Sequence, residues 1–171
     1  MSKTLVAYFS RKGNNYVAGS IVNLEIGNTA VIAGYLTEAL NADTFEIEAA
    51  HTYPKDYHDC TKVAKTEKQN QERPALTATL KSLEAYDTVY LGFPNWWNTL
   101  PMPVFTFLEH HDFAGKTIIP FCTHEGSGIG NSVTDIKKAC PGATVKDGIA
   151  IWGHAVNNQK NNIITWLEGA N

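Results

Sequence analysis

Five short apolar runs are spaced along the chain, and they predict five β-strands. The first, Thr4–Phe9, is apolar at nearly every position, which is typical of a parallel strand with both faces covered. Further runs at Thr44–Ile47, Thr88–Leu91, Lys116–Phe121 and Thr144–Ile151 have the length expected of strands.

Between these runs the apolar positions follow helical spacing. The first helix is predicted by the apolar residues Val31, Ile32, Tyr35, Leu36, Ala39 and Leu40. Asn28 and Thr29 are the candidates for its N-cap, because their side chains accept hydrogen bonds from the free amides of a helix start. Pro101 and Pro103 suit the first turn of a later helix, and Ser132–Ala139 predicts another.

The remaining stretches are less regular. Lys55–Glu72 has few apolar positions, so it is interpreted as a solvated helix or a long excursion. Leu80 and Leu83 predict a short helical turn, and Ile163–Leu167 marks a terminal helix. Strands that alternate with helices favour a three-layer α/β/α fold with a five-stranded parallel sheet. The leading strand order is 2-1-3-4-5, one of the common doubly wound arrangements.

Composition narrows the classes of protein. The 171 residues fit a single domain. The net charge of −3 argues against nucleic acid as the main partner, because binding to a phosphate backbone needs a basic surface. No apolar run is long enough to predict a membrane span, and the N-terminus does not resemble a signal peptide. Cys60, Cys122 and Cys140 form no CxxC motif, so reduced thiols in the cytoplasm are expected.

The loop after the first strand runs from Ser10 to Gly27-Asn28-Thr29 at the start of the predicted helix. A helix N-terminus with free amides is an anion site, and Ser10, Asn28 and Thr29 add polar side chains. Gly27 permits a tight backbone turn. The loop is therefore either a phosphate cradle or a plain helix cap, and its residues alone leave the two interpretations equal.

The loop after the third strand contains Pro94-Asn95-Trp96-Trp97. Two adjacent tryptophans that follow a core strand cannot both face inward, so at least one is expected on the surface or in a cleft. A flat aromatic ring there suits a flat aromatic ligand, since stacked rings gain energy beyond their area burial. The alternative is that both rings cap the core or contact a partner subunit.

The loop after the fourth strand contains Thr123-His124-Glu125-Gly126-Ser127-Gly128. Its glycines would let the backbone approach the edge of a flat ligand. The carboxyl ends of these three strands meet near the point where the strand order reverses, which is where open α/β sheets bind ligands. A phosphate site, an aromatic wall and a backbone-lined edge match the three parts of flavin mononucleotide, FMN.

These motifs resemble those of flavodoxin-like proteins over nearly the whole chain: Tyr8-Phe9-Ser10 with Gly27-Asn28-Thr29, Gly92–Trp97, and Thr123–Gly128. The resemblance implies one non-covalently bound FMN and electron transfer to a redox partner protein or a small-molecule acceptor. The cofactor-binding residues that follow from it are Ser10, Asn14, Gly27, Asn28, Thr29, Pro94, Asn95, Trp96, Trp97, Thr123, His124, Glu125, Gly126 and Gly128. Asn14 is included because Ser10–Asn15 is itself similar to a shorter form of the phosphate motif.

Three functions are compared. An FMN-binding electron-transfer protein is the leading interpretation. Typical electron-shuttle flavodoxins are strongly acidic, and the net charge of only −3 raises the alternative of an NAD(P)H-dependent reductase of quinones or other small molecules on the same scaffold. A non-redox receiver module needs an acidic cluster at the ends of the first and third strands. Those ends are Phe9-Ser10 and Gly92-Phe93, which disfavours it.

Overall fold

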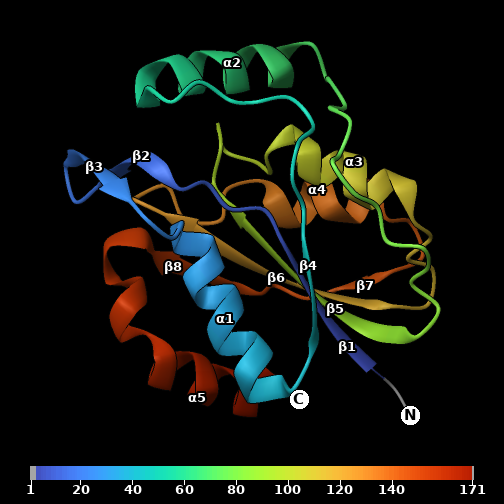
Figure 1. The fold of residues 1–171 in the computed structure, drawn as a ribbon. Helices are drawn as coiled ribbons and strands as arrows, with labels where there is room; N and C mark the ends of the chain where they lie inside the picture. The colour runs from blue at the N-terminus through green and yellow to red at the C-terminus, as the bar shows by residue number, and fades with distance from the viewer. Residues whose placement is uncertain (1–2, 171) are drawn as a thin grey trace.

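The computed structural model describes residues 3–170 and places a parallel sheet at the centre of the molecule (Figure 1). The strands lie in the order β4 (Asp43–Glu46), β1 (Lys3–Tyr8), β5 (Tyr86–Pro94), β6 (Thr117–His124) and β7 (Thr144–Val145). A further strand, β8 (Ile149–Trp152), also pairs with β6, and all of these pairs are parallel. The order is therefore the predicted 2-1-3-4-5, with β7 and β8 as two pieces of the fifth strand.

The break in the fifth strand has its cause in the neighbouring strand, β6. The ladder between β6 and β7 ends at Ile118, and the ladder between β6 and β8 resumes at Phe121 with one extra residue on the partner side. Pro120 lies between these two positions and has no N–H to donate to a neighbouring strand. Gly148, with a φ of 72°, comes so close that a Cβ there would collide with the Pro120 carbonyl oxygen.

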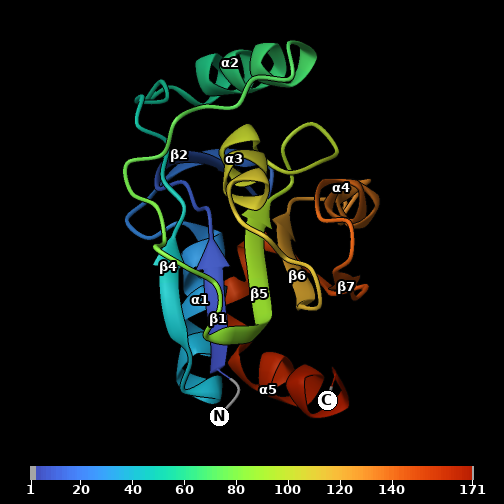
Figure 2. The same cartoon turned by 90° about the vertical axis from the view of Figure 1, so that its right-hand side faces the viewer.

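Helices cover both faces of the sheet (Figures 1 and 2). One face carries α1 (Asn28–Leu40) and α5 (Lys160–Ala170), and the other carries α3 (Met102–His110) and α4 (Ser132–Ala139). A short 3-10 turn, η1 (Gly153–Asn158), follows β8. These bounds agree with the predicted helices, and the three-layer fold is confirmed.

Each face of the sheet has its own buried core. Val6 of β1 packs with Ile32 of α1 on one side. Its neighbour Leu5 packs on the opposite side, in the cluster that contains Phe107 of α3 and Ile136 of α4. The continuous apolar run of β1 thus serves both cores, as expected for a strand covered on both faces.

A β-hairpin, which the sequence analysis missed, lies between β1 and α1. Its strands are β2 (Gly13–Val17) and β3 (Ser20–Leu24), which pair in antiparallel register. The two turn residues Ala18 and Gly19 have φ values of 49° and 87°, as a tight hairpin turn with the twist of the strands requires. The segment interpreted as an irregular phosphate loop is therefore an ordered two-stranded projection.

The segment Lys55–Glu72 contains α2 (Tyr57–Gln69), which begins at the N-cap Asp56. Figures 1 and 2 show α2 across the end of the sheet to which the parallel strands point, rather than on either face. The helix predicted as one option is present, and its place is over the carboxyl edge. The helical turn predicted at Leu80 and Leu83 is wrong. Residues 76–85 contain no helix, because both leucines pack on the core from an extended return to β5.

None of the described helices has the length and apolar content of a membrane span. Cys60, Cys122 and Cys140 are all free and buried. Burial raises the pKa of the Cys122 and Cys140 thiols to about 12, and it also raises the pKa of Cys60.

The native protein is therefore expected to resist thiol reagents. At pH 8 a thiol with a pKa of about 12 is ionised about a thousandfold less than a free cysteine with a pKa of about 8.5. Alkylation followed by intact mass is expected to leave Cys122 and Cys140 unmodified in the native protein and to modify all three thiols after unfolding in guanidinium. Fast labelling of the native protein would contradict the burial.

Candidate functional site

A cavity of about 490 Å³ lies at the carboxyl edge of the sheet. The loops after β1, β5 and β6 form one part of its wall, as expected at the switch point of this strand order. The predicted residues that line it are Asn28, Thr29, Pro94, Asn95, Trp96, Trp97, Thr123, His124 and Glu125. The structure therefore brings together nine of the fourteen predicted site residues, drawn from three separate loops.

The start of α1 supplies free amides to this cavity. Gly27 is the N-cap, not Asn28 or Thr29 as predicted, and no side chain of the cap residue bonds to the helix. The Ser10 hydroxyl instead accepts from the Ala30 amide at 3.1 Å. Within the described part of the chain, no acceptor is found for the amides of Asn28 and Thr29, the first two helical residues. These two amides and the helix dipole form an anion site beside the cavity.

Ser10 and Gly27 shape this anion site without lining the cavity. A Cβ on Gly27 would collide with the Ser10 hydroxyl and lie 2.7 Å from the Arg11 carbonyl oxygen. Glycine is therefore needed for the β1 loop to close onto α1. The Thr29 hydroxyl is bonded to the Thr123 hydroxyl at 2.8 Å, and this buried contact ties the helix start to the β6 loop.

The two tryptophans of the β5 loop are held by different contacts. Trp96 is half-buried and meets Phe9 and Tyr53 edge to face, with ring centroids 5.1 and 5.2 Å away. Trp97 is 44% exposed, and its indole N–H donates to the Thr61 carbonyl of α2 at 2.9 Å. Both rings line the cavity, and the Lys65 ammonium lies over the Trp97 ring, 5.2 Å from its centroid.

The β6 loop presents a histidine with a defined hydrogen-bond role. The Gly126 amide donates to Nδ1 of His124 at 2.9 Å, so the proton of the neutral ring belongs on Nε2. Burial is the main cause that lowers the pKa of His124; the charge of Glu125 opposes this shift, and His154 adds to it. His124 is therefore a neutral hydrogen-bond donor at neutral pH.

Glu125 joins three segments at the rim. Its Oε2 accepts from the Ala18 amide of the hairpin turn at 3.1 Å and lies 3.1 Å from Nδ1 of His154. Its Oε1 is buried without a hydrogen-bond partner among the described residues. A Cβ on Gly153 would come within 2.5 Å of this oxygen and 2.6 Å of the Asn28 side-chain nitrogen. An unpaired acceptor at a cavity wall fits a ligand that carries a hydroxyl group.

Three other predicted residues, Asn14, Gly126 and Gly128, lie outside the cavity lining. Asn14 belongs to β2, where its carbonyl oxygen accepts from Arg11. The Gly128 carbonyl oxygen accepts a hydrogen bond at 2.7 Å from the side-chain nitrogen of Asn95, which lines the cavity. Both phosphate motifs therefore contribute lining residues: Arg11 and Asn15 from the first, and Asn28 and Thr29 from the second.

The other half of the wall lies outside the predicted list of cofactor-binding residues, although Ser127 belongs to the predicted Thr123–Gly128 motif. The additional lining residues are Arg11, Asn15, Tyr16, Tyr57, Cys60, Thr61, Ala64, Ser127 and Gly153. Most of them belong to the hairpin segment or to α2. A usable signal for the hairpin was the pair of short β-prone stretches around Ala18-Gly19. No local signal places α2 over the sheet edge.

Polar contacts hold α2 over the cavity. The Arg11 guanidinium donates to the carbonyl oxygens of Pro54 and Lys55, both at 3.0 Å, just before the helix. Glu67 is 5% exposed; its Oε2 accepts from the Tyr53 hydroxyl at 2.7 Å, and its Oε1 lies 2.9 Å from Nε2 of His51. Burial and this bond to Glu67 raise the pKa of Tyr53, so its hydroxyl remains a donor.

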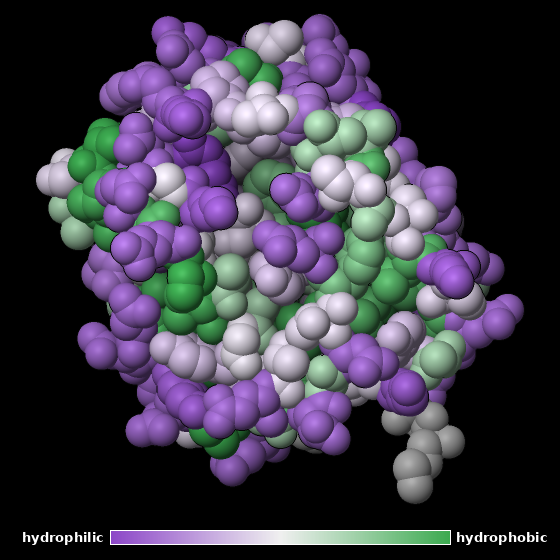
Figure 3. Space-filling view, in the orientation of Figure 1, coloured by the Kyte–Doolittle hydropathy of each residue, from purple (hydrophilic) through white to green (hydrophobic). Residues whose placement is uncertain are grey.

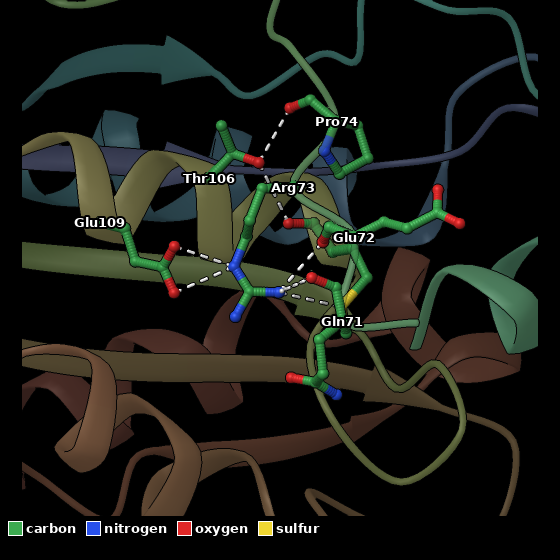
Figure 4. A network of polar contacts seen from close by, with 7 residues as sticks. Gln71, Glu72, Arg73, Pro74, Thr106 and Glu109 are labelled. Atoms are coloured by element: carbon green, nitrogen blue, oxygen red, sulfur yellow. Dashed lines mark hydrogen bonds and ion pairs between the residues drawn. The ribbon is translucent and has the colours of Figure 1, made fainter. Parts of the chain in front are cut away.

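The chain that leaves α2 is fixed to α3 (Figure 4). The Arg73 guanidinium contacts both carboxylate oxygens of Glu109 at 2.9 Å and the carbonyl oxygens of Gln71 and Glu72. The Thr106 hydroxyl donates to the Pro74 carbonyl at 2.8 Å. Since both ends of α2 are tied down, the helix is a fixed roof of the cavity.

Comparison with known proteins agrees with the fold. A model of the flavodoxin family matches residues 3–170. The chain belongs to the flavodoxin family. A protein from Bacteroides uniformis, described as a flavoprotein, is 35% identical with a TM-score of 0.77 over 98% of both chains. Another from Bacteroides eggerthii is 32% identical, with a TM-score of 0.78 over 98% of this chain and 97% of that one.

A more distant member of the fold was solved with a ligand. The flavoprotein from Lactobacillus acidophilus in complex with FMN is 18% identical, with a TM-score of 0.62 over 94% of this chain and 99% of that one. No curated protein matches the chain.

Proposed function

We propose that the protein binds one FMN non-covalently in the carboxyl-edge cavity and transfers electrons through it. Membership of the flavodoxin family and the FMN complex of the Lactobacillus acidophilus flavoprotein support FMN as the cofactor. The observation that carries the proposal is the pair of free amides, Asn28 and Thr29, beside a cavity with two tryptophans in its wall.

The residues present fit each part of FMN. The free amides and dipole of α1 suit the phosphate, and the first turn of α1 has no acidic side chain to repel it. The unpaired Oε1 of Glu125 suits a hydroxyl of the ribityl chain. Trp96 and Trp97 suit the flat ring, and the Nε2–H of His124 suits a ring carbonyl. Bound FMN would supply the redox chemistry, while the protein orients it and limits water.

A small-molecule reductase is the second candidate, and the position of α2 favours it. A helix fixed over the edge of the sheet narrows the approach of a large protein partner to the cavity. Steady oxidation of NAD(P)H by the FMN-loaded protein with a small acceptor would select the reductase. Fast reduction by a partner reductase, without such turnover, would select the electron carrier.

Titration with FMN and with riboflavin tests the proposed cofactor site. Riboflavin lacks the phosphate, so FMN is expected to bind about thirtyfold more tightly, or ~2 kcal/mol, from hydrogen bonds to a charged group. Quenching of flavin fluorescence gives both dissociation constants. Equal affinities for FMN and riboflavin would show that the start of α1 does not bind the phosphate. If neither flavin bound, the proposal would be overturned.

Trp97→Ala is expected to weaken FMN binding by about tenfold, or ~1.4 kcal/mol, because a stacked aromatic contact is lost. Trp97→Phe keeps an aromatic ring and is expected to retain most of the affinity. The same fluorescence titration measures both variants. Unchanged binding by Trp97→Ala would assign the stacking to Trp96.

A further inference from the structure

Part of the cavity wall does not belong to the residues assigned to FMN. It comes from the hairpin segment, through Arg11 and Tyr16, and from α2, through Tyr57, Cys60, Thr61 and Ala64. In the space-filling view the surface is hollowed beneath α2 (Figure 3). This part of the wall has no contact assigned to the cofactor.

The shape of this half suits a flat molecule. Three of the α2 residues in the wall, Cys60, Thr61 and Ala64, have small side chains, so the helix contributes little side-chain volume there. At one side Tyr57 stacks on Tyr16, with ring centroids 6.2 Å apart and planes 29° apart. The Trp97 indole also contacts this helix, through its hydrogen bond to the Thr61 carbonyl. We refer to this part of the wall, with its aromatic rings and the small residues of α2, as the slot.

The chemistry of the slot favours a ligand that accepts hydrogen bonds. None of its lining residues from the hairpin segment or α2 is a carboxylate, and Arg11 brings a positive charge. Burial raises the pKa of both Tyr57 and Cys60, although Arg11 lowers each in part. The Tyr57 hydroxyl therefore keeps its proton and can donate it to a carbonyl oxygen.

We propose that this slot is a subsite for a small, flat aromatic electron acceptor with carbonyl groups, of the quinone class. The inference rests on the proposed FMN function and names its acceptor. In the reaction the quinone gains two electrons and two protons and becomes a hydroquinone. Bound FMN in its reduced form would supply two electrons and one proton and would be left oxidised, and solvent would supply the second proton. Tyr57 and Ala64 are then residues that determine acceptor specificity.

Calorimetric titration of the oxidised, FMN-loaded protein with tetramethyl-1,4-benzoquinone tests the subsite without turnover. This quinone has no open ring position for addition of a thiol such as Cys60. One saturable site per protein is expected. Ala64→Phe fills the slot and is expected to weaken quinone binding at least tenfold, and Tyr57→Ala about fivefold. Thr66→Phe, at an exposed position of α2 outside the cavity, is the matched control with unchanged binding.

FMN affinity of every variant is measured in parallel, and it separates the two proposals. The subsite predicts that Ala64→Phe changes FMN affinity less than threefold while quinone binding is lost. Normal FMN binding by the wild type without saturable quinone binding would overturn the subsite and leave the FMN function standing. If Ala64→Phe weakened the binding of FMN and of quinone equally, α2 would be assigned to the flavin site and the subsite would be overturned. No FMN binding by the wild type would overturn both.

Discussion

Gly27→Ala is expected to weaken FMN binding by at least about a hundredfold, or ~2.7 kcal/mol. The new Cβ would collide with the Ser10 hydroxyl and approach the Arg11 carbonyl oxygen to 2.7 Å and its carbon to 2.9 Å. These are mostly backbone atoms, so the β1 loop must move away from the start of α1. Gly27 has a φ of −63°, which alanine adopts freely, so the effect is a steric displacement of the anion site.

Gly34→Ala is the matched control for this substitution. Gly34 also lies in α1, but no atom lies within 4 Å of a Cβ built there. Alanine at this helical position is expected to raise the free energy of unfolding by up to about 1 kcal/mol and to leave FMN affinity unchanged. Fluorescence titration and urea unfolding measure both variants. Wild-type affinity in Gly27→Ala would refute the role of this close contact in the phosphate site.

Glu67→Ala is expected to lower the free energy of unfolding by about 2–3 kcal/mol, because a buried carboxylate loses its bonds to Tyr53 and His51. The Tyr53 hydroxyl would be left without its acceptor beside Trp96. FMN affinity is therefore expected to fall severalfold, and the segment around α2 should become sensitive to limited proteolysis. Glu67→Gln keeps an acceptor for Tyr53 and is expected to lose less than half as much stability.

A surface ion pair provides the control. Glu38 of α1 pairs with Lys160 at 2.9 Å, but the two side chains are 68% and 48% exposed. Glu38→Ala is expected to change the free energy of unfolding by less than about 0.5 kcal/mol. Urea unfolding measures both glutamates under the same conditions. Similar small changes for Glu67→Ala and Glu38→Ala would show that the roof does not depend on the buried contacts.

The strand order and the three ligand loops could be predicted because their signals are local. A run such as Thr4–Phe9 must lie between two apolar layers, and alternation with helices permits few topologies. Once the order is known, the carboxyl ends of β1, β5 and β6 must meet. The residues Asn28, Trp96 and His124, far apart in the chain, therefore line one cavity.

The roof could not be predicted because its causes are not local. Lys55–Glu72 is polar, and its one buried carboxylate, Glu67, finds its partners only after folding. The hairpin projects from the loop after β1, and a lone two-stranded hairpin has too little core to give a strong pattern. The break between β7 and β8 depends on Pro120 in the neighbouring strand β6, so the sequence of the fifth strand alone does not predict it.

The visible absorption spectrum of the purified protein, with identification of any flavin released on heating, tests the central claim most directly. After incubation with excess FMN and gel filtration, we expect a yellow protein that carries one FMN per chain and releases it unmodified. A colourless protein, or flavin that passes through the column unbound, would contradict FMN binding at the carboxyl edge of the sheet.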